Sequence, residues 1–496
     1  MGGTTAWVLG DQLSPDNPAL VGADRALMIE SAARATRRRR YHRRKLVLVF
    51  SAMRHRAAEL EGELDVDYRE SESTFEAIAD HVDRYSPDRL TMVGASEYQG
   101  RRFQESLGER LGVDVEILPN TQMLVERHDP FPDADLGKRV VMESFYREMR
   151  RHFDVLMDGP DPVGGRWNLD DQNRKPYPRS GLDPPKVPSF EPDAITREVM
   201  RRVAGLDGIG SVEGFDLAVT RAGASSAFGN FIAQRLEAFG PYEDAMAANH
   251  DHLYHSVLSP YLNIGLLDPL DLVRSAERAH FEGRAPLNSV EGFVRQIIGW
   301  REFVYWSYWR MMPGLITANS WGHRRGIPDW WWTGETDMRC LSSVIGRVTE
   351  SGYSHHIERL MILCNFAMLA RLDPSAVNEW FLSMYVDAYE WVVTPNVIGM
   401  GLNADGGVIA TKPYIASANY INKMSDFCGE CTYSHTQRTG ERACPFNHLY
   451  WNFLIRNEER LRSNPRSGRA VLGLAHLDAE ERRQVQEQAE AFLGRL

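Results

Sequence analysis

The first 125 residues alternate short apolar runs with amphipathic stretches. The apolar runs are rich in Val, Leu and Ile, which is typical of strands, and they cover residues 4–10, 25–31, 45–53, 65–70, 88–96 and 113–119. Three further stretches, at 53–62, 74–85 and 101–112, have the spacing of amphipathic helices. Strands that alternate with helices predict a parallel sheet with helices on its faces, a Rossmann-like α/β domain over residues 1–125. No G-x-G-x-x-G stretch follows a strand, so the dinucleotide fingerprint is missing from the sequence.

The pattern changes after this domain. Residues 159–193 are rich in Pro, Gly and Asp, which predicts a connector with little regular structure. From residue 194 the periodicity is helical, and within 289–309 the side chains of Phe293, Ile297, Trp300 and Val304 recur on one helix face. We therefore expect an α/β domain over 1–125, a linker over 126–193 and a large all-α domain over 194–496.

Composition narrows the class of protein. Hydrophobic residues at 43% and charged residues at 25% are typical of a globular protein. No apolar run reaches the length of a membrane span, and the first residues lack the pattern of a secretory leader, so we expect a cytoplasmic monomer without a membrane partner. The net charge of −11 does not favour nucleic-acid binding, but a local basic face is sufficient for it. The densest basic run covers residues 35–45, and a solvated loop or helix face is its simplest interpretation.

Three of the five cysteines lie close together near the C-terminus. Cys428 and Cys431 form a C-x-x-C pair, and Cys444 follows them. In a reducing compartment this pattern favours a metal site over disulfides. A thiolate site needs a fourth ligand, and the candidates are His435, His448, Cys340 and Cys364. Zinc and an iron–sulfur cluster both remain open on spacing alone. Cys364 lies in an apolar helix, which favours a packing role.

Two further groups could carry chemistry. Residues 354–373 have a helical pattern, with Ser354 as the expected N-cap and His355 and His356 in the first turn. Histidines titrate near neutral pH and can transfer protons, although capping polarity is the simpler interpretation of this pair. Trp330, Trp331 and Trp332 are consecutive; such clusters usually serve packing, and a redox protein can also use them as electron relays.

Several motifs together resemble one family. The segments "HSVLSPYLNIG" (255–265) and "GWREF" (299–303), with Arg359 and Asp387 after them, resemble the photolyase and cryptochrome family. The segments "LGDQLSP", "FSAMRH", "YINKMSDFCGECTY" and "ACPFNHLYW" resemble one branch of it, the prokaryotic (6-4) photolyases and iron–sulfur bacterial cryptochromes.

The resemblance implies three cofactors. FAD would lie in the helical domain, bound by His255, Ser256, Leu258, Ser259, Gln296, Trp300, Arg301, Arg359, Asp387 and Asn396. A [4Fe–4S] cluster would be held by Cys340, Cys428, Cys431 and Cys444. An antenna pigment, 6,7-dimethyl-8-ribityllumazine in this branch, would bind at the ends of the strands. The crevice rule then selects Asp11, Gln12, Glu30 and Ser51.

The resemblance also implies an activity, the light-driven repair of (6-4) pyrimidine photoproducts in UV-damaged DNA. The damaged bases would flip into a pocket. His355, His356, Tyr414 and Tyr420 would act on the lesion, Lys423 would contact DNA, and Trp380 and Trp332 would relay electrons to the flavin. The alternative is a cryptochrome-type blue-light photoreceptor with the same cofactors and little repair. A zinc-stabilised nucleic-acid-binding protein without flavin is a third interpretation.

Overall fold

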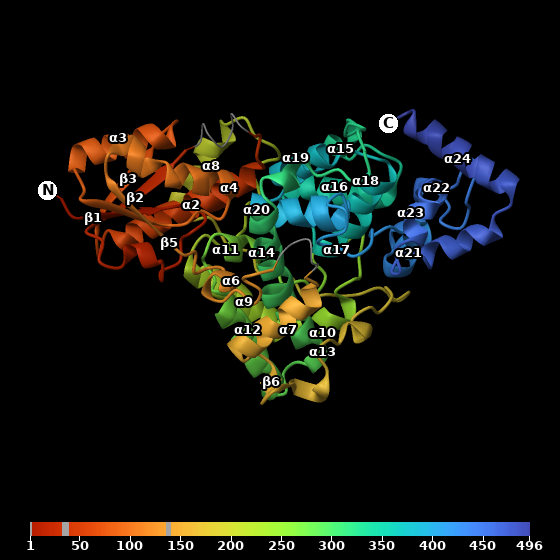
Figure 1. Cartoon of the computed structure of the whole chain (residues 1–496), viewed down its shortest axis with the longest axis horizontal. Coiled ribbons are helices and arrows are strands. Elements are labelled where there is room, and N and C mark those ends of the chain that lie inside the picture. The colour runs from red at the N-terminus through yellow and green to blue at the C-terminus, as the bar shows by residue number, and fades with distance from the viewer. Residues whose placement is uncertain (1, 32–38, 135–139) are drawn as a thin grey trace.

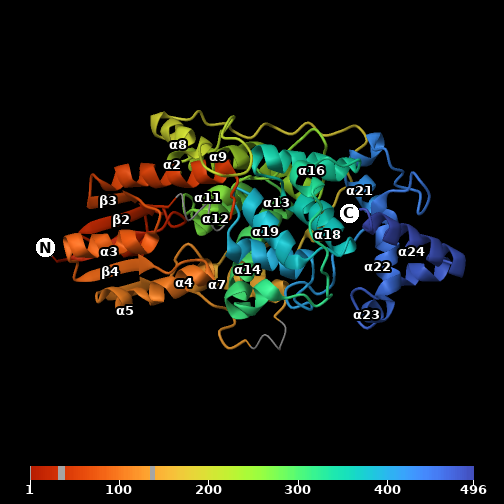
Figure 2. The same ribbon diagram turned by 90° about the horizontal axis from the view of Figure 1, so that it is seen from above.

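The computed structural model describes residues 2–31, 39–134 and 140–496. It is elongated, with an α/β domain at one end and the helices α22 to α24 at the other (Figures 1 and 2). The strands are β1 (Thr4–Val8), β2 (Arg25–Glu30), β3 (Asp65–Glu70), β4 (Arg89–Val93) and β5 (Asp114–Leu118). They form a parallel sheet in the order β3-β2-β1-β4-β5, which confirms the predicted fold class.

Alternate side chains of the sheet face two different layers. Val8 and Met28 pack toward α2 (Arg43–Leu60), which lies on one face. Trp7 and Leu27 pack into a separate cluster with residues of α3 (Thr74–Tyr85), α4 (Tyr98–Glu105) and α5 (Leu107–Leu111). The chain leaves β1 toward β2 on one side and reaches β4 on the other, so the crevice of the sheet lies at the carboxyl ends of β1 and β4.

The strand predicted at 45–53 is wrong, because these residues form the first half of α2. A short, continuously apolar run has no period that separates a buried strand from a buried helix. This helix is buried along much of its length between the sheet and α8 (Ala194–Ala204), which explains its apolar run (Figure 2). Of the basic run, residues 35–38 lie outside the described residues, and Arg43 opens α2.

The Pro-, Gly- and Asp-rich part of the predicted linker, residues 159–193, holds little regular structure, as expected. From the start of the linker onward the chain forms α6 (Leu124–Arg127), α7 (Met142–Phe153), the hairpin of β6 (Met157–Asp158) and β7 (Asp161–Pro162), and the short turns η2 (Val163–Gly165) and η3 (Asp170–Gln172). Helix α7 packs on the helical domain, whereas α8 returns to α2 of the α/β domain. The domain limits at 125 and 193 stay predictions.

The remainder is helical, as predicted. Its elements are α9 (Arg221–Gln234), α10 (Leu236–Tyr242), α11 (Ser259–Asn263), α12 (Pro269–Phe281), α13 (Leu287–Val294), η4 (Arg295–Arg301), α14 (Glu302–Met311), η5 (Gly314–Thr317), α15 (Trp330–Thr333), α16 (Arg339–Ser351), α17 (His356–Glu358), η6 (Arg359–Cys364), α18 (Asn365–Leu369), α19 (Pro374–Met384), α20 (Glu390–Thr394), η7 (Pro395–Gly401), α21 (Ala418–Met424), η8 (Phe427–Glu430), α22 (Pro445–Arg456), α23 (Glu458–Arg462), η9 (Ala470–His476) and α24 (Ala479–Leu493). Within the described residues, every helix is too short or too polar to cross a membrane.

Three of these elements, η4, η6 and η7, are π-helical segments inside longer helices. Such segments are rare and occur mostly at functional sites, because they shift one face of a helix by a residue. All three contain residues that the resemblance assigns to the flavin.

Candidate cofactor and active site

The centre of the candidate site is an ion pair between Arg359 and Asp387. The Arg359 Nη2 atom lies 2.9 Å from Asp387 Oδ2, and Nη1 lies 3.1 Å from Oδ1. Burial opposes the charge of Arg359, but Asp387 outweighs it, so the pKa of the guanidinium is raised. The bidentate geometry fixes the plane of the guanidinium. Its carbon lies 4.0 Å from the centre of the Tyr385 ring.

The segment 255–259 meets this ion pair. The Ser259 hydroxyl donates to Asp387 Oδ2 at 2.6 Å, and Asn263 Nδ2 donates to the Asp387 carbonyl at 2.8 Å. Between Ser256 and Leu258, Val257 has a φ of 58°. A β-branched residue in this left-handed region is a true outlier, and such strain of about 1–3 kcal/mol collects at binding sites.

The other predicted flavin residues point in different directions. Gln296 and Trp300, both in η4, are partly exposed. Arg301 forms an ion pair with Glu302 and donates to the carbonyl of Gln122 at 3.2 Å, so its guanidinium faces the loop after β5. Asn396 in η7 donates its amide to the Val392 carbonyl at 2.7 Å, a contact within its own helix.

Three histidines gather beside the ion pair. The rings of His255 and His355 stack with their centres 4.2 Å apart, and His356 lies 5.2 Å from His255, edge to face. The expected Ser354 cap is wrong: His355 is the N-cap residue, and the Ser354 hydroxyl hydrogen-bonds the Tyr385 hydroxyl at 2.8 Å. The Tyr385 partner takes the serine hydroxyl away from the helix end.

The His356 side chain is exposed to solvent, although many protein atoms surround its ring. Burial, followed by the charges of Arg359 and Arg295, lowers its pKa to about 4. Burial and neighbouring charges hold the pKa of His355 well below its ordinary value. In this state of the site both imidazoles are therefore neutral at pH 7.

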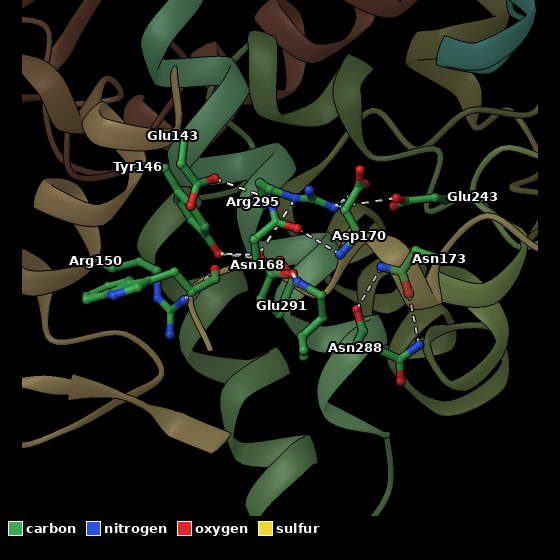
Figure 3. A network of polar contacts seen from close by, with 12 residues as sticks. Glu143, Tyr146, Arg150, Asn168, Asp170, Asn173, Glu243, Asn288, Glu291 and Arg295 are labelled. Carbon is green, nitrogen blue, oxygen red and sulfur yellow. Dashed lines mark hydrogen bonds and ion pairs between the residues drawn. The ribbon is translucent and has the colours of Figure 1, made fainter. Parts of the chain in front are cut away.

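Arg295 belongs to a buried polar network that the sequence did not single out (Figure 3). It lies 2.9 Å from Asp170, 3.6 Å from Glu243 and 3.7 Å from Glu291. The Tyr146 hydroxyl donates to Glu291 at 3.1 Å, which joins α7 to α13. The network therefore connects the 168–173 stretch of the linker to the helix that leads into the candidate site.

Tyr414 and Tyr420 lie beside this network. Both are partly buried, and the charges of Arg174 and Asp244 act on both rings. Lys423 follows at the last turn of α21 and is exposed. Tyr414 and Tyr420 therefore lie in the same region as the Arg295 network, and the charge of Arg295 also acts on His356.

The four predicted cluster cysteines also come together. Cys340 lies in α16, Cys428 and Cys431 at η8, and Cys444 caps α22. Burial, and then the thiols of Cys444, Cys428 and Cys431, raise the pKa of Cys340 well above its ordinary value. Cys364 lies elsewhere, against Gly401. Within residues 2–31, 39–134 and 140–496, no three His, Cys, Asp or Glu side chains converge as ligands of a single metal ion.

The alternative ligand His448 is buried, and its ring centre lies 5.6 Å from that of Phe492. It belongs to α22, the helix whose N-cap residue is Cys444. The Asn447 Nδ2 atom donates a hydrogen bond to the backbone carbonyl oxygen of His435 at 2.8 Å. Among the fourth ligands that spacing left open, Cys340 interacts electrostatically with all three of the other cysteines.

The crevice of the sheet holds two of the four predicted antenna residues in the expected place. Asp11 and Gln12 follow β1, and burial raises the pKa of Asp11 to about 6. Glu30 ends β2 but is engaged by Arg54, Arg202 and Tyr68. Ser51 does not follow a strand as expected, because the third predicted strand is helix; its hydroxyl is buried in α2.

Sequence reasoning missed a buried lysine in the same crevice. Lys45 sits with its ammonium 4.4 Å from the centre of the Tyr389 ring, and burial lowers its pKa to about 8. Both Asp11 and Asp387 act on its charge. The residue therefore lies between the crevice and the Arg359–Asp387 pair. Lys45 begins an apolar run that the sequence analysis predicted as a strand, and this prediction concealed its position.

The predicted tryptophans are arranged differently from expectation. Trp380 is fully buried, and its ring centre lies 6.0 Å from Tyr385. The tryptophan ring that contacts Trp380 is Trp331, at 5.9 Å. Trp332 is 42% exposed.

Comparisons with known proteins agree with this geometry. The chain is 44% identical over 503 residues to a (6-4) photolyase of Agrobacterium fabrum, covering 99% of each chain. Residues 6–217 match the family described as deoxyribodipyrimidine photo-lyase-related protein. Among solved structures, it is similar to a bacterial class III photolyase from Agrobacterium tumefaciens, with a TM-score of 0.59 and 17% identity over 100% of this chain and 98% of that one. A Synechocystis cryptochrome matches with a TM-score of 0.59 and 13% identity over 98% and 94% of the two chains. These two solved structures share the fold of this chain. Because the similarity to the (6-4) photolyase covers the full length of both proteins, the chain belongs to the photolyase/cryptochrome family.

Proposed function

We propose that this protein binds FAD beside the Arg359–Asp387 pair and repairs (6-4) photoproducts in DNA under light. The observation that carries the proposal is that the Arg359–Asp387 ion pair accepts a hydrogen bond from Ser259 of segment 255–259 and lies close to the exposed ring of His356. The full-length similarity to a (6-4) photolyase supports the choice of lesion.

The polar groups around the site fit a flavin dinucleotide. The Nε2 atom of His255 and both ring nitrogens of His355 are buried without a hydrogen-bond partner among the described residues. Nearby, the Nε and Nη2 atoms of Arg235 are also buried and unpartnered in the described structure, and burial lowers the pKa of Arg235 to about 10. Unpaired buried donors and a buried cation are costly alone but suit a pyrophosphate and a flavin ring.

The chain's own residues would position the lesion and supply its proton. Bound and reduced, FAD supplies the electron that light transfers to the damaged bases. Tyr414 and Tyr420 offer ring faces for flipped bases, and the exposed Lys423 suits a phosphate. His356 is the proton donor: the phosphates of bound DNA bring negative charge beside it and raise its pKa toward the working range.

The four thiols suit a [4Fe–4S] cluster better than zinc. A cubane binds each thiolate at a different iron, so its ligands surround a volume and do not converge on one point. This agrees with four cysteines that interact electrostatically while the described residues hold no convergent single-ion site. We also propose the crevice of Asp11 and Gln12 as the antenna site for a ribityllumazine; Glu30, held by Arg54, Arg202 and Tyr68, and Ser51, buried in α2, remain the weaker candidates.

The direct test is illumination of the purified, reduced protein with an oligonucleotide that carries one (6-4) lesion, followed by product analysis. We expect restored thymines in the light and none in the dark, with little activity on a cyclobutane dimer. FAD binding and photoreduction without repair would instead support the cryptochrome-type photoreceptor.

A further inference from the structure

Lys45 brings a buried ammonium group from the α/β domain to the backbone beside Asp387. The residue lies in the first turn of α2, and its Nζ atom donates a hydrogen bond to the backbone carbonyl of Ala388. The side chain of Asn263, from the helical domain, donates to the backbone carbonyl of Asp387 at 2.8 Å. Two donors from different domains therefore hold two consecutive carbonyls at the residue that pairs with Arg359.

Two further contacts from the α/β domain hold the same segment, residues 383–390, which joins α19 to α20. The backbone N–H of His42 donates to the Ser383 carbonyl at 2.8 Å. At the other end, the backbone N–H of Glu390 donates to Glu97 Oε1 at 2.8 Å. Asp387 lies between these two contacts, so its position depends on how the α/β domain docks against the helical domain.

Aromatic rings and carboxylates surround the ammonium group of Lys45. Its Nζ atom lies 4.7 Å from the ring centre of Tyr41 and 4.4 Å from that of Tyr389. A desolvated cation is attracted to the faces of such rings.

The charged groups around Lys45 come from both domains. Burial lowers its pKa to about 8, and Arg39 acts in the same direction, whereas Glu97, Asp387 and Asp11 oppose them. The side chain is therefore mostly protonated at pH 7, and its positive charge acts on the same carboxylate that Arg359 binds.

A buried cation beside the Arg359–Asp387 pair also acts on a flavin bound there. The flavin ring gains negative charge when it is reduced, and protein charges near the ring tune its potential. Inside a protein such charges interact more strongly than in water. At fixed geometry, removal of the Lys45 charge therefore disfavours the reduced flavin, whatever charges the neighbouring groups carry.

We propose that Lys45 is a positioning residue of the flavin site, which holds segment 383–390 from the α/β domain and supplies a positive charge that favours reduced FAD. The inference rests on the proposed binding of FAD. It gives the α/β domain a role at the flavin site that does not depend on an antenna pigment.

The test is a redox titration of the full-length, FAD-loaded protein, followed by flavin absorbance. Lys45→Met keeps a long, unbranched side chain but removes the charge, so we expect the midpoint potential of FAD to shift to more negative values. Lys45→Arg keeps the charge and should restore most of that shift. Arg102→Met removes a positive charge from a side chain that is 66% exposed and should leave the potential unchanged, because solvent and salt screen that charge.

A second variant reverses the sign and keeps the inference testable if Lys45→Met does not fold. Glu97→Gln removes a negative charge beside Lys45 but retains a side-chain oxygen that can accept from the Glu390 N–H. We expect its midpoint potential to shift to more positive values. A contribution to the fold alone would not produce opposite shifts in the two variants.

FAD content, pigment content and Tm are measured on the same samples. An unchanged potential in Lys45→Met with native FAD content overturns the inference, as does a shift of the same sign in Lys45→Met and Glu97→Gln. Loss of the antenna pigment from Lys45→Met without a change in potential would assign the residue to the antenna site instead. These results leave the proposed repair in place, whereas a native protein that binds no FAD overturns the proposed function and the inference with it.

Discussion

His356 is exposed to solvent at the candidate site, and burial together with two arginines holds it neutral at pH 7. Burial, Arg359 and Arg295 lower its pKa to about 4. We expect His356→Gln to bind and photoreduce FAD normally but to repair (6-4) lesions about 100-fold more slowly or worse, the usual loss when a proton donor is removed. Repair under light and photoreduction are measured side by side. The exposed His476 supplies the control variant His476→Gln, and native repair by His356→Gln would exclude this role.

Glu243 makes stability depend on pH. Its Oε2 atom is buried without a partner among the described residues, and burial raises its pKa from 4.5 to about 8, against the effect of Arg295. Between these values the folded state retains a proton that the unfolded chain has released, so this residue's contribution to stability falls as pH rises from 4.5 to 8. Glu243→Gln should flatten that fall.

The measurement is the Tm of both proteins at pH 6 and pH 8. We expect the Tm of the native protein to fall further than that of Glu243→Gln between pH 6 and pH 8. In a chain of this size, each kcal/mol of difference in stability corresponds to about 2–4 °C in Tm or less. Glu487 is an exposed carboxylate with a side-chain exposure of 61%, so Glu487→Gln should follow the native curve. Parallel curves for native protein and Glu243→Gln would contradict the raised pKa.

Single residues also mark the limit of sequence reasoning. Arg359 and Asp387 could be paired in advance because a family resemblance carried them. The contacts of Lys45, Arg295 and Trp331 could not be predicted, because they join segments far apart in the chain. The choice between Trp331 and Trp332 depends on the rotation of one helical turn, which the sequence does not specify.

At the scale of elements, periodicity located the five strands of the sheet and the region of α3, α4 and α5, and it predicted the helical character of the second half, but it failed at α2. The helix is apolar on several sides because α8 covers it, and α8 follows more than a hundred residues later. The π-helical segments η4, η6 and η7 were equally invisible, because one inserted residue hardly changes a 3.6-residue pattern. These segments flank the candidate flavin site, so sequence reasoning failed where function distorts the regular elements.

The cluster site takes its four cysteines from three elements, α16, η8 and α22, and Arg339 of α16 also pairs with Glu430 of η8 at 2.6 Å. We expect anaerobically purified protein to contain iron and no stoichiometric zinc. Cys340→Ser should lose the iron and lower the Tm, because binding free energy at such a site is folding free energy. Iron analysis and thermal unfolding test this, with Cys364→Ser as the control that keeps its iron. Zinc in place of iron, or an intact cluster in Cys340→Ser, would contradict the assignment.

At the scale of the whole molecule, the net charge of −11 does not prevent cationic side chains from gathering around Tyr414. Lys412 lies 5.9 Å from the Tyr414 ring centre, and the charges of Arg174 and Arg466 act on that ring together with those of Asp170 and Asp244. Lys423, in α21, is exposed. The densest basic run of the sequence, 35–45, does not contribute to this region, because its described members mostly make internal contacts: Arg39 pairs with Glu379, Arg43 binds backbone carbonyls and Lys45 is buried. We propose this region as the DNA-binding face; if so, folding assembles that face from separate segments, and no single run of like charges forms it.

We expect the affinity for (6-4)-containing duplex to fall steeply with salt, because each phosphate contact releases counterions and adds about 0.9 to the slope of log K against log salt. Lys423→Ala should lower that slope by about 1, and Lys412→Ala should do the same if both contact phosphates. Fluorescence anisotropy between about 50 and 200 mM salt measures it, with Arg102→Ala, an exposed position in α4, as the control. Damaged duplex should bind more tightly than intact duplex at every salt concentration, since a distorted lesion costs less to flip. Equal affinity for both duplexes, with an unchanged slope in Lys423→Ala, would argue that this face does not bind lesions and would favour the photoreceptor.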